Sequence, residues 1–282
     1  MGSGRKAFFN LEAGFTQNGN NGNGGNGSLF SRQSNVGLSS EAGTITLGQQ
    51  LSPYILSHAV SQVNPGNFWV NRIIMGGGLN NAALNLSGNA SAQQAGGFFI
   101  ANAVTYTTPS ISGWTGTGMV STKSSAQDGT VNAITDSDRY TSLAVNGSFA
   151  GINITAANQD RKNLYSSWII GGTYAIDDLT IAVNYNRHTD QGQQSVNSYL
   201  LGASYKLSGA TTLVAGLARN NLNQAQGLTN VGVKYDLSKA TFVYLTYVRA
   251  TNGAISSLAD RGNYATAGAA NSNTVVGVSH SF

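Results

Sequence analysis

Apolar and polar residues alternate through most of this 282-residue chain. The alternation is clearest over Leu228 to Ala250, where two alternating arms flank a polar reversal at Ser238 and Lys239. A period of two is typical of a β-strand with one apolar and one polar face. The stretch therefore predicts a β-hairpin. It does not decide whether the apolar face packs on a second sheet or faces lipid.

Runs of the same kind recur along the chain and predict about fourteen strands. They cover residues 7–16, 33–40, 44–50, 98–107, 114–121, 140–149, 151–159, 165–174, 179–187, 198–206, 212–220, 228–237, 241–250 and 274–282. Short connections alternate with long ones, and the long ones are 17–30, 51–97, 122–139, 160–164, 188–197, 221–227 and 251–273. An even strand number with alternating short turns and long loops is typical of an antiparallel up-and-down barrel in an outer membrane.

Composition and the placement of aromatic residues favour the membrane barrel over a soluble β-protein. Charged residues make up 9% of the chain, against about 25% in ordinary soluble domains. No run approaches the roughly 20 apolar residues that a membrane helix needs. Tyr, Trp and Phe gather near the two ends of the predicted strands, as the two interfaces of a bilayer require. The sequence therefore predicts an all-β transmembrane barrel.

Residues 51–97 stand apart because they carry almost no period-two signal. A connection of this length inside a compact domain is usually functional. We expect it to fold toward the lumen of the barrel and to constrict it.

The chain gives little support for catalysis or for a bound cofactor. It has no cysteine and only three histidines, His58, His188 and His280, which are far apart in the sequence. No nucleophile motif or metal-ligand spacing is present. The net charge of +4 comes without a basic run, so no nucleic-acid partner is expected. We predict a protein that is not an enzyme and uses no cofactor or metal.

Four stretches resemble the trimeric general porins of Gram-negative bacteria, in particular the β-proteobacterial branch. They are LFSRQSNVGLSSEAGTITLGQQ (29–50), NAVTYTTPSISGW (102–114), VGVKYDLSKAT with YLTY (231–247) and the ending VVGVSHSF. The resemblance implies a water-filled outer-membrane pore for passive diffusion of ions and small hydrophilic solutes, assembled as a homotrimer. It also implies that the loop after TLG constricts the pore and that Phe282 is the signal read by the barrel assembly machinery.

The resemblance sets expectations for the ends of the chain as well. Such porins usually have sixteen strands, and this chain resembles them from its KAFF segment onward. We therefore expect the first two strands to be absent, either because the chain is truncated or engineered or because it is a smaller natural variant. The strand that ends at Phe282 is then expected to pair with residues 7–16. Residues 1–6 look like a cloning remnant without an export signal, and 7–282 are expected to form one barrel domain.

The candidates for the pore wall are charged residues on the inward parity, together with Arg32 at a strand start of ambiguous parity and Arg72 in the expected constriction loop. The pore-lining or constriction candidates are Glu12, Arg32, Arg72, Lys206 and Lys234, and the candidates that anchor the loop are Phe68, Trp69, Ile73 and Ile74. Gln49 stands where the family pattern suggests a basic residue. The small excess of basic over acidic residues predicts a weak preference of the pore for anions. Arg187, Arg219 and Arg249 fall at outer strand ends, where they face headgroup phosphates or water. The alternative function is a plugged barrel that serves as a membrane anchor or adhesin without conduction.

Overall fold

The computed structural model describes residues 4–13, 30, 32–63, 99–121, 139–162, 165–190, 195–221, 227–251 and 271–281. Within them lie fourteen strands, which confirms the predicted number. They are β1 (Lys6–Glu12), β2 (Gln33–Ser40), β3 (Gly43–Leu51), β4 (Phe99–Thr107), β5 (Trp114–Ser121), β6 (Tyr140–Phe149), β7 (Ile152–Arg161), β8 (Tyr165–Ile176), β9 (Leu179–Asp190), β10 (Ser195–Lys206), β11 (Thr211–Asn220), β12 (Gly227–Asp236), β13 (Thr241–Thr251) and β14 (Asn271–His280).

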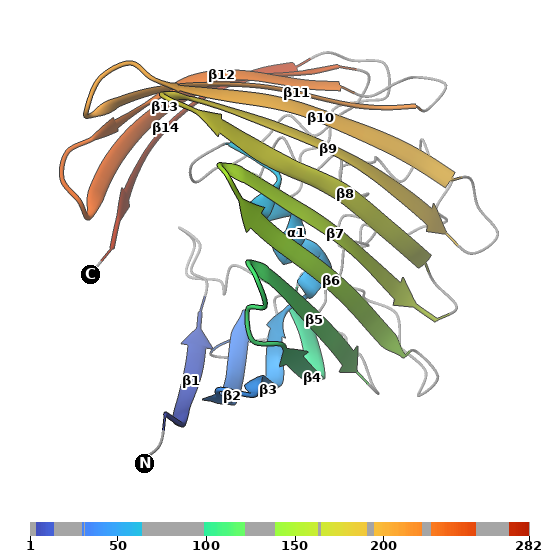
Figure 1. Ribbon diagram of the computed structural model, residues 1–282. Coiled ribbons are helices and arrows are strands. Elements are labelled where there is room, and N and C mark those ends of the chain that lie inside the picture. Colours follow the sequence, from blue (N-terminus) through green and yellow to red (C-terminus); the bar gives the residue numbers. More distant parts are fainter. Residues whose placement is uncertain are drawn as a thin grey trace.

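The strands form a single antiparallel sheet in which each strand pairs with its neighbours in the sequence. Figure 1 shows that the sheet curls around the helix α1 (Pro53–Val60), which lies on its concave side. None of the described helices is long and apolar enough to cross a bilayer.

The alternation in the sequence separates the two faces of the sheet. On β11, for example, Leu213 and Leu217 are 42% and 49% exposed on the convex face, while Val214 and Ala218 are buried on the concave face. Leu, Val, Ile or aromatic side chains are similarly exposed on the convex face of every other strand except β7. Such an extensive apolar outer surface is what lipid contact requires.

Four strands extend two or three residues further at the long-loop end than the alternation predicts. β7 continues to Arg161, β9 continues to Asp190, β10 begins at Ser195 and β14 begins at Asn271, so the predicted long connections at 160–164, 188–197 and 251–273 are shorter. Arg161 and His188 are therefore wall residues rather than loop residues. The connection between β6 and β7 is also corrected, because Ala150 and Gly151 together form the turn at φ 47° and 78°. Positive φ at both central residues is the geometry of a tight type I′ hairpin.

The expected pairing between the last strand and the first is not formed by the described residues. β1 pairs only with β2, and β14 pairs only with β13. Figure 1 shows the two strands at opposite ends of the curled sheet. Each of them keeps one edge without a partner strand in the part of the chain described.

Candidate functional site

Helix α1 begins and ends at residues with clear local causes. The Ser52 hydroxyl accepts a hydrogen bond from the backbone N–H of Ile55 at 3.2 Å, and Pro53 occupies the first turn. Ser is a favoured N-cap, and Pro is tolerated at the first helical position because no intrahelical N–H is needed there. The helix ends at Ser61, whose hydroxyl donates back to the Ser57 carbonyl at 3.1 Å. The helix within the predicted loop 51–97 was not expected from the alternation.

Polar contacts hold both ends of α1 against the inner wall. At the N-terminal end, the backbone N–H of Tyr54 donates to the Ser142 hydroxyl on β6 at 3.1 Å, and the Asn186 amide on β9 donates to the Tyr54 hydroxyl. At the C-terminal end, the Asn184 amide donates to the Ser61 carbonyl at 3.2 Å and to its hydroxyl at 3.1 Å. The start of the predicted constriction loop therefore lies on the concave, lumen side of the wall, as expected.

Apolar contacts add to these hydrogen bonds. Ile55 packs with Ala144, Ala157 and Ile169, which lie on the consecutive strands β6, β7 and β8. Leu56 points the other way and is 47% exposed. One face of α1 therefore packs on the wall, while the opposite face is accessible from the lumen.

Two glycines allow the chain to approach the wall this closely. A Cβ atom at Gly171 on β8 would lie 2.8 Å from the Ser61 Cβ, besides meeting Asn184 on the neighbouring strand. A Cβ atom at Gly202 on β10 would lie 2.9 Å from Val63 Cγ2. Both distances are shorter than a carbon contact tolerates, so the segment after α1 depends on the absence of these side chains.

His58, in the last turn of α1, is fully buried. Neither ring nitrogen has a hydrogen-bond partner among the residues that the structure describes, and the Tyr54 ring lies 4.9 Å away, centroid to centroid, in an edge-on arrangement. Burial without a partner disfavours the charged ring, and the pKa of His58 is lowered to about 3. The histidine is therefore neutral while the helix is docked.

A chain of polar side chains crosses the inner wall beside the helix. The Tyr140 hydroxyl donates to the Gln159 amide oxygen at 3.0 Å, and the Gln159 amide nitrogen donates to the Ser167 hydroxyl at 3.3 Å. Ser167 Oγ lies 2.7 Å from His188 Nδ1. The sequence did not predict this network, because His188 was assigned to a loop. The signal was present, since His188 continues the inward parity of β9.

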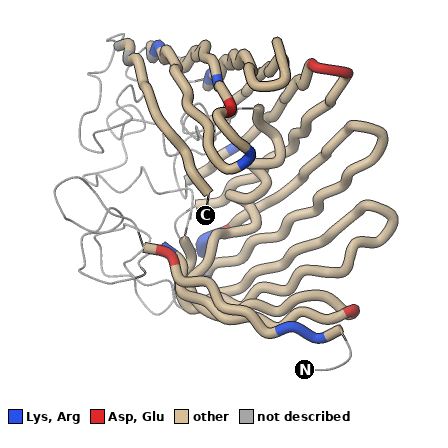
Figure 2. The backbone as a smooth tube through the Cα atoms, turned by 90° about the vertical axis from the view of Figure 1, so that its left-hand side faces the viewer, with Lys and Arg blue, Asp and Glu red and all other residues tan. Residues whose placement is uncertain are grey.

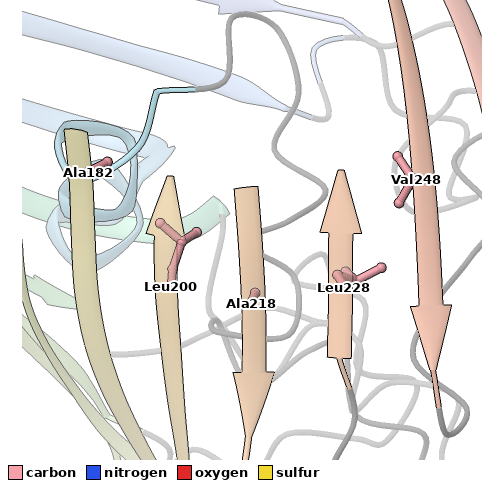
Figure 3. Packing of buried hydrophobic residues seen from close by; sticks show 5 residues of the cluster. All are labelled: Ala182, Leu200, Ala218, Leu228 and Val248. Carbon is pink, nitrogen blue, oxygen red and sulfur yellow. The ribbon is translucent and has the colours of Figure 1, made fainter. Parts of the chain in front are cut away.

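An apolar patch interrupts the polar wall on the other side of α1. Figure 3 shows its five side chains, one on each of five consecutive strands: Ala182, Leu200, Ala218, Leu228 and Val248. Val63, which follows α1, packs against this patch. The segment that begins with α1 therefore continues along the wall from β8 toward β10.

The predicted charged candidates divide between the two ends of the wall. At the long-loop end, Glu12 forms an ion pair with Arg32 and accepts a hydrogen bond from the Gln33 amide at 2.7 Å. The Arg32 guanidinium carbon lies 4.7 Å from the centre of the Phe99 ring. Glu12 and Arg32 are thus brought together, and each is about one third exposed.

At the short-turn end, Lys234 forms an ion pair with Asp236 at 2.9 Å. Its ammonium nitrogen also lies 5.3 Å from the centre of the Phe242 ring. Lys206 and Lys234 both pair in register with Thr212, so they flank β11 on the same face. Figure 2 shows how sparse the charged residues are along the strands. The structure therefore does not gather the predicted charges at one point.

Several predicted residues lie outside the described part of the chain. They are Phe68, Trp69, Arg72, Ile73, Ile74 and Phe282. Arg161, which was not predicted, lies on the inner face of β7 and is 1% exposed. Among the described residues, no group of three or more His, Cys, Asp or Glu side chains could hold a metal ion.

Comparison with known proteins agrees with this architecture. The sequence model of the Gram-negative porins matches residues 1–255. No curated protein matches the chain. The anion-selective porin from Comamonas acidovorans is similar in structure, with a TM-score of 0.74 and 20% identity over 100% of this chain and 86% of that chain. The trimer form of OmpT from Vibrio cholerae has a TM-score of 0.62 and 16% identity over 88% of this chain and 80% of that chain.

OmpF from Salmonella typhi, in a complex with daunomycin, has a TM-score of 0.60 and 14% identity over 88% of this chain and 77% of that chain. These likenesses support the fold, while the sequence match covers most of the chain. Three features of the structure agree with that match: the curled antiparallel sheet, the apolar convex surface and the helix on the inner wall. The chain belongs to the Gram-negative porin family and is a channel protein of the bacterial outer membrane.

Proposed function

We propose that the protein is a passive, water-filled channel for ions and small hydrophilic solutes, narrowed by the segment that begins with α1. The observation that carries this proposal is the docking of α1 on the inner faces of β6 to β9 through Ser142, Asn184 and Asn186. A helix held by hydrogen bonds on one side of the lumen reduces the bore and leaves a lumen-facing surface, here at Leu56.

The proposed pore wall includes Glu12, Arg32, Lys206 and Lys234, together with Arg72 in the constriction segment. Two inward acidic side chains are described, and each forms an ion pair with a basic side chain: Glu12 with Arg32 and Asp236 with Lys234. Lys206 has no acidic partner among the described residues. Charges on a narrow wall of low dielectric constant set the preference of a channel for one sign of ion. A weak preference for anions follows, and the likeness to a porin named as anion-selective supports it.

Recordings from planar lipid bilayers test both parts of the proposal. Purified protein should insert and produce stepwise increases in conductance. In a salt gradient, the reversal potential should have the sign of the equilibrium potential of the anion. Insertion without conductance would support the plugged barrel instead, and a reversal potential on the cation side would refute the anion preference alone.

We also propose that the chain assembles as a homotrimer. The support is the likeness to OmpT, which has been solved as a trimer, and the extensive apolar outer surface, part of which a neighbouring copy would cover. Mass measured by light scattering on the detergent-solubilised protein, corrected for bound detergent, should equal three chains. A mass of one chain at all detergent concentrations would contradict this assembly.

A further inference from the structure

A row of hydroxyl side chains crosses the inner face of four consecutive strands, β2 to β5. Its members are Ser39, Thr44, Thr107 and Thr117, and each pairs in register with the next. All four side chains are partly exposed, and none of them is charged. Because neighbouring strands lie about 4.8 Å apart, the row is about 14 Å long. We call these four residues the hydroxyl row.

The hydroxyl row leads from the docked helix toward the short turns. On the next two strands the same register continues to Ala144 and Ala157, on which Ile55 of α1 packs. At the other end of the row, Ser39 and Thr44 lie beside the short turn between β2 and β3. A solute that passes α1 on this side of the lumen therefore meets the hydroxyl row (Figure 1).

Hydrogen bonds hold the hydroxyl groups of the row in place. Thr44 Oγ1 donates to Ser39 Oγ at 3.0 Å, and the hydroxyl oxygens of Thr107 and Thr117 are hydrogen-bonded at 3.2 Å. Threonine is also stiff about χ1, because its Cβ atom is branched. A hydroxyl group has one donor and two acceptor positions, so each bonded pair can still bind a further group. The row therefore presents hydrogen-bonding groups in fixed positions.

An aromatic ring lies next to the hydroxyl row. Phe8 on β1 pairs in register with Gly37 on β2 and is 39% exposed. Its ring covers the glycine, since a Cβ atom at Gly37 would lie 2.2 Å from Phe8 Cζ. Only glycine leaves room for the ring there. Gly37 precedes Ser39 by two residues, so the ring and the first hydroxyl group are neighbours on the same face of β2.

Hydroxyl groups beside an aromatic ring match the surface of a sugar. A pyranose carries hydroxyl groups around its rim and C–H groups on its two faces. The rim can both donate hydrogen bonds to serine and threonine side chains and accept them. The C–H groups carry a slight positive charge and pack favourably on the negative face of an aromatic ring. A small inorganic ion would gain nothing from the aromatic ring.

We propose that the hydroxyl row and Phe8 form a weak, saturable binding site for uncharged pyranose sugars. The inference rests on the proposed channel function and names a class of solute for it. Weak binding fits a transport path, because a solute must leave the site as well as enter it. Lys6 pairs in register with Ser39 at the end of the row, but an uncharged sugar does not need its ammonium group.

Titration of the reconstituted channel with glucose tests the site. A sugar bound in the lumen obstructs the ion current, so the current should fall to a plateau as the glucose concentration rises. Thr44→Val combined with Thr107→Val removes two hydroxyl groups at nearly constant volume. This double variant should raise the half-saturating concentration by about fivefold or more, because each lost hydrogen bond weakens binding. Phe8→Ala should raise it as well, because the ring is lost.

The chain offers matched controls for these variants. Phe9, the neighbour of Phe8, is 73% exposed on the convex face, and Thr229 is an exposed threonine on the convex face of β12. Phe9→Ala and Thr229→Val should therefore leave the half-saturating concentration of glucose unchanged, and so should Lys6→Gln. Glycerol, which has hydroxyl groups but no ring, should lower the current only as far as it lowers the conductivity of the solution.

Three results would overturn the proposal. They are a current that follows the conductivity of the glucose solution without saturation, an unchanged half-saturating concentration in the site variants, and an equally strong obstruction by glycerol. Any of them in a channel that conducts normally would leave the proposed channel function intact. If the protein does not conduct at all, the channel function fails, and calorimetric titration of the detergent-solubilised protein with glucose decides the sugar site by itself.

Heat-resistant electrophoretic mobility verifies that each variant is folded. If the double variant does not fold, Thr107→Val and Phe8→Ala, measured singly, take its place. Unaltered glucose binding in both of these single variants would also refute the site.

Discussion

Asn184 on β9 holds the end of helix α1 by donating its side-chain amide to Ser61, at 3.2 Å to the carbonyl oxygen and at 3.1 Å to the hydroxyl. The two residues are 123 positions apart in the sequence. A single side chain of the wall thus binds both the backbone and the side chain at the point where the helix ends.

Replacement of Asn184 by alanine should loosen α1. The change leaves the buried Ser61 groups without their donor, which costs about 1–3 kcal/mol. We expect noisier and larger single-channel currents, and faster hydrogen exchange of the amides of α1. Asn153→Ala is the control, because Asn153 donates a comparable 3.0 Å bond to Thr173 on the wall away from the helix. Unchanged currents and exchange in Asn184→Ala would show that Asn184 does not hold the helix.

A side chain at Gly202 should push the segment after α1 away from the wall. A Cβ atom at this position would already lie 2.9 Å from Val63 Cγ2, so Gly202→Leu leaves no room for Val63 in its present place. The conductance should change, while the barrel should remain resistant to heat. Gly209→Leu serves as the control, since a Cβ atom there meets nothing within 4 Å. Identical conductance in the two variants would mean that Val63 does not pack there in the working channel.

Acid should release α1 through His58. Because the pKa of the buried ring is about 3 rather than 6.5, only the undocked helix gains a proton as the pH falls below 6.5. Docking therefore has its full strength above pH 6.5 and weakens by about 1.4 kcal/mol for each pH unit between 6.5 and 3. Hydrogen exchange of α1 should accelerate over this range.

His58→Phe keeps a ring in the site and removes the titration, so its exchange should lose the acid-dependent acceleration. His280→Phe is the control, because His280 lies exposed on the outward face of β14 and its loss should leave the acceleration in place. The same acid response in His58→Phe as in the unaltered protein would exclude His58 as its cause.

Charge reversal at the short-turn end should alter ion preference. Lys206→Glu and Lys234→Glu each replace an inward cation by an anion, and Lys234→Glu also places a carboxylate beside Asp236. We expect the reversal potential in a salt gradient to move toward the cation side in both variants. Lys239→Glu, in the exposed turn, should produce a smaller shift. Equal shifts in all three variants would indicate a general effect of net charge rather than a role for the wall.

The strands could be predicted where lipid lies on one side and the lumen on the other. β13 was predicted as 241–250 and spans Thr241–Thr251. Lipid favours apolar residues on one face and the lumen favours polar residues on the other, so the sequence of such a strand alternates. The contrast disappears beyond the apolar band, where both faces are polar. For this reason the sequence around Asp160 and Arg161 resembled a loop, although the strand continues.

The helix could not be predicted from periodicity because it has only eight residues. Its local signals, Ser52 as N-cap and Pro53 in the first turn, were present in the sequence. What fixes its position is a set of partners such as Asn186, which is 132 residues from Tyr54. Partners at this distance are invisible to any local pattern. The sequence also placed Glu12 and Arg32 on one list of candidates without indicating that they form an ion pair.

The long separation between α1 and its partners also imposes an order on folding. Residues 52–61 are synthesised well before Asn184 and Asn186, yet their hydrogen bonds require β9 to be in place. Contacts between distant parts of a chain form late, because a long loop must close before any favourable contact is made. We therefore expect the hydrogen bonds from Asn184 and Asn186 to form only after β9 has joined the wall. On this order, the bore is wide first and narrows when α1 completes its docking.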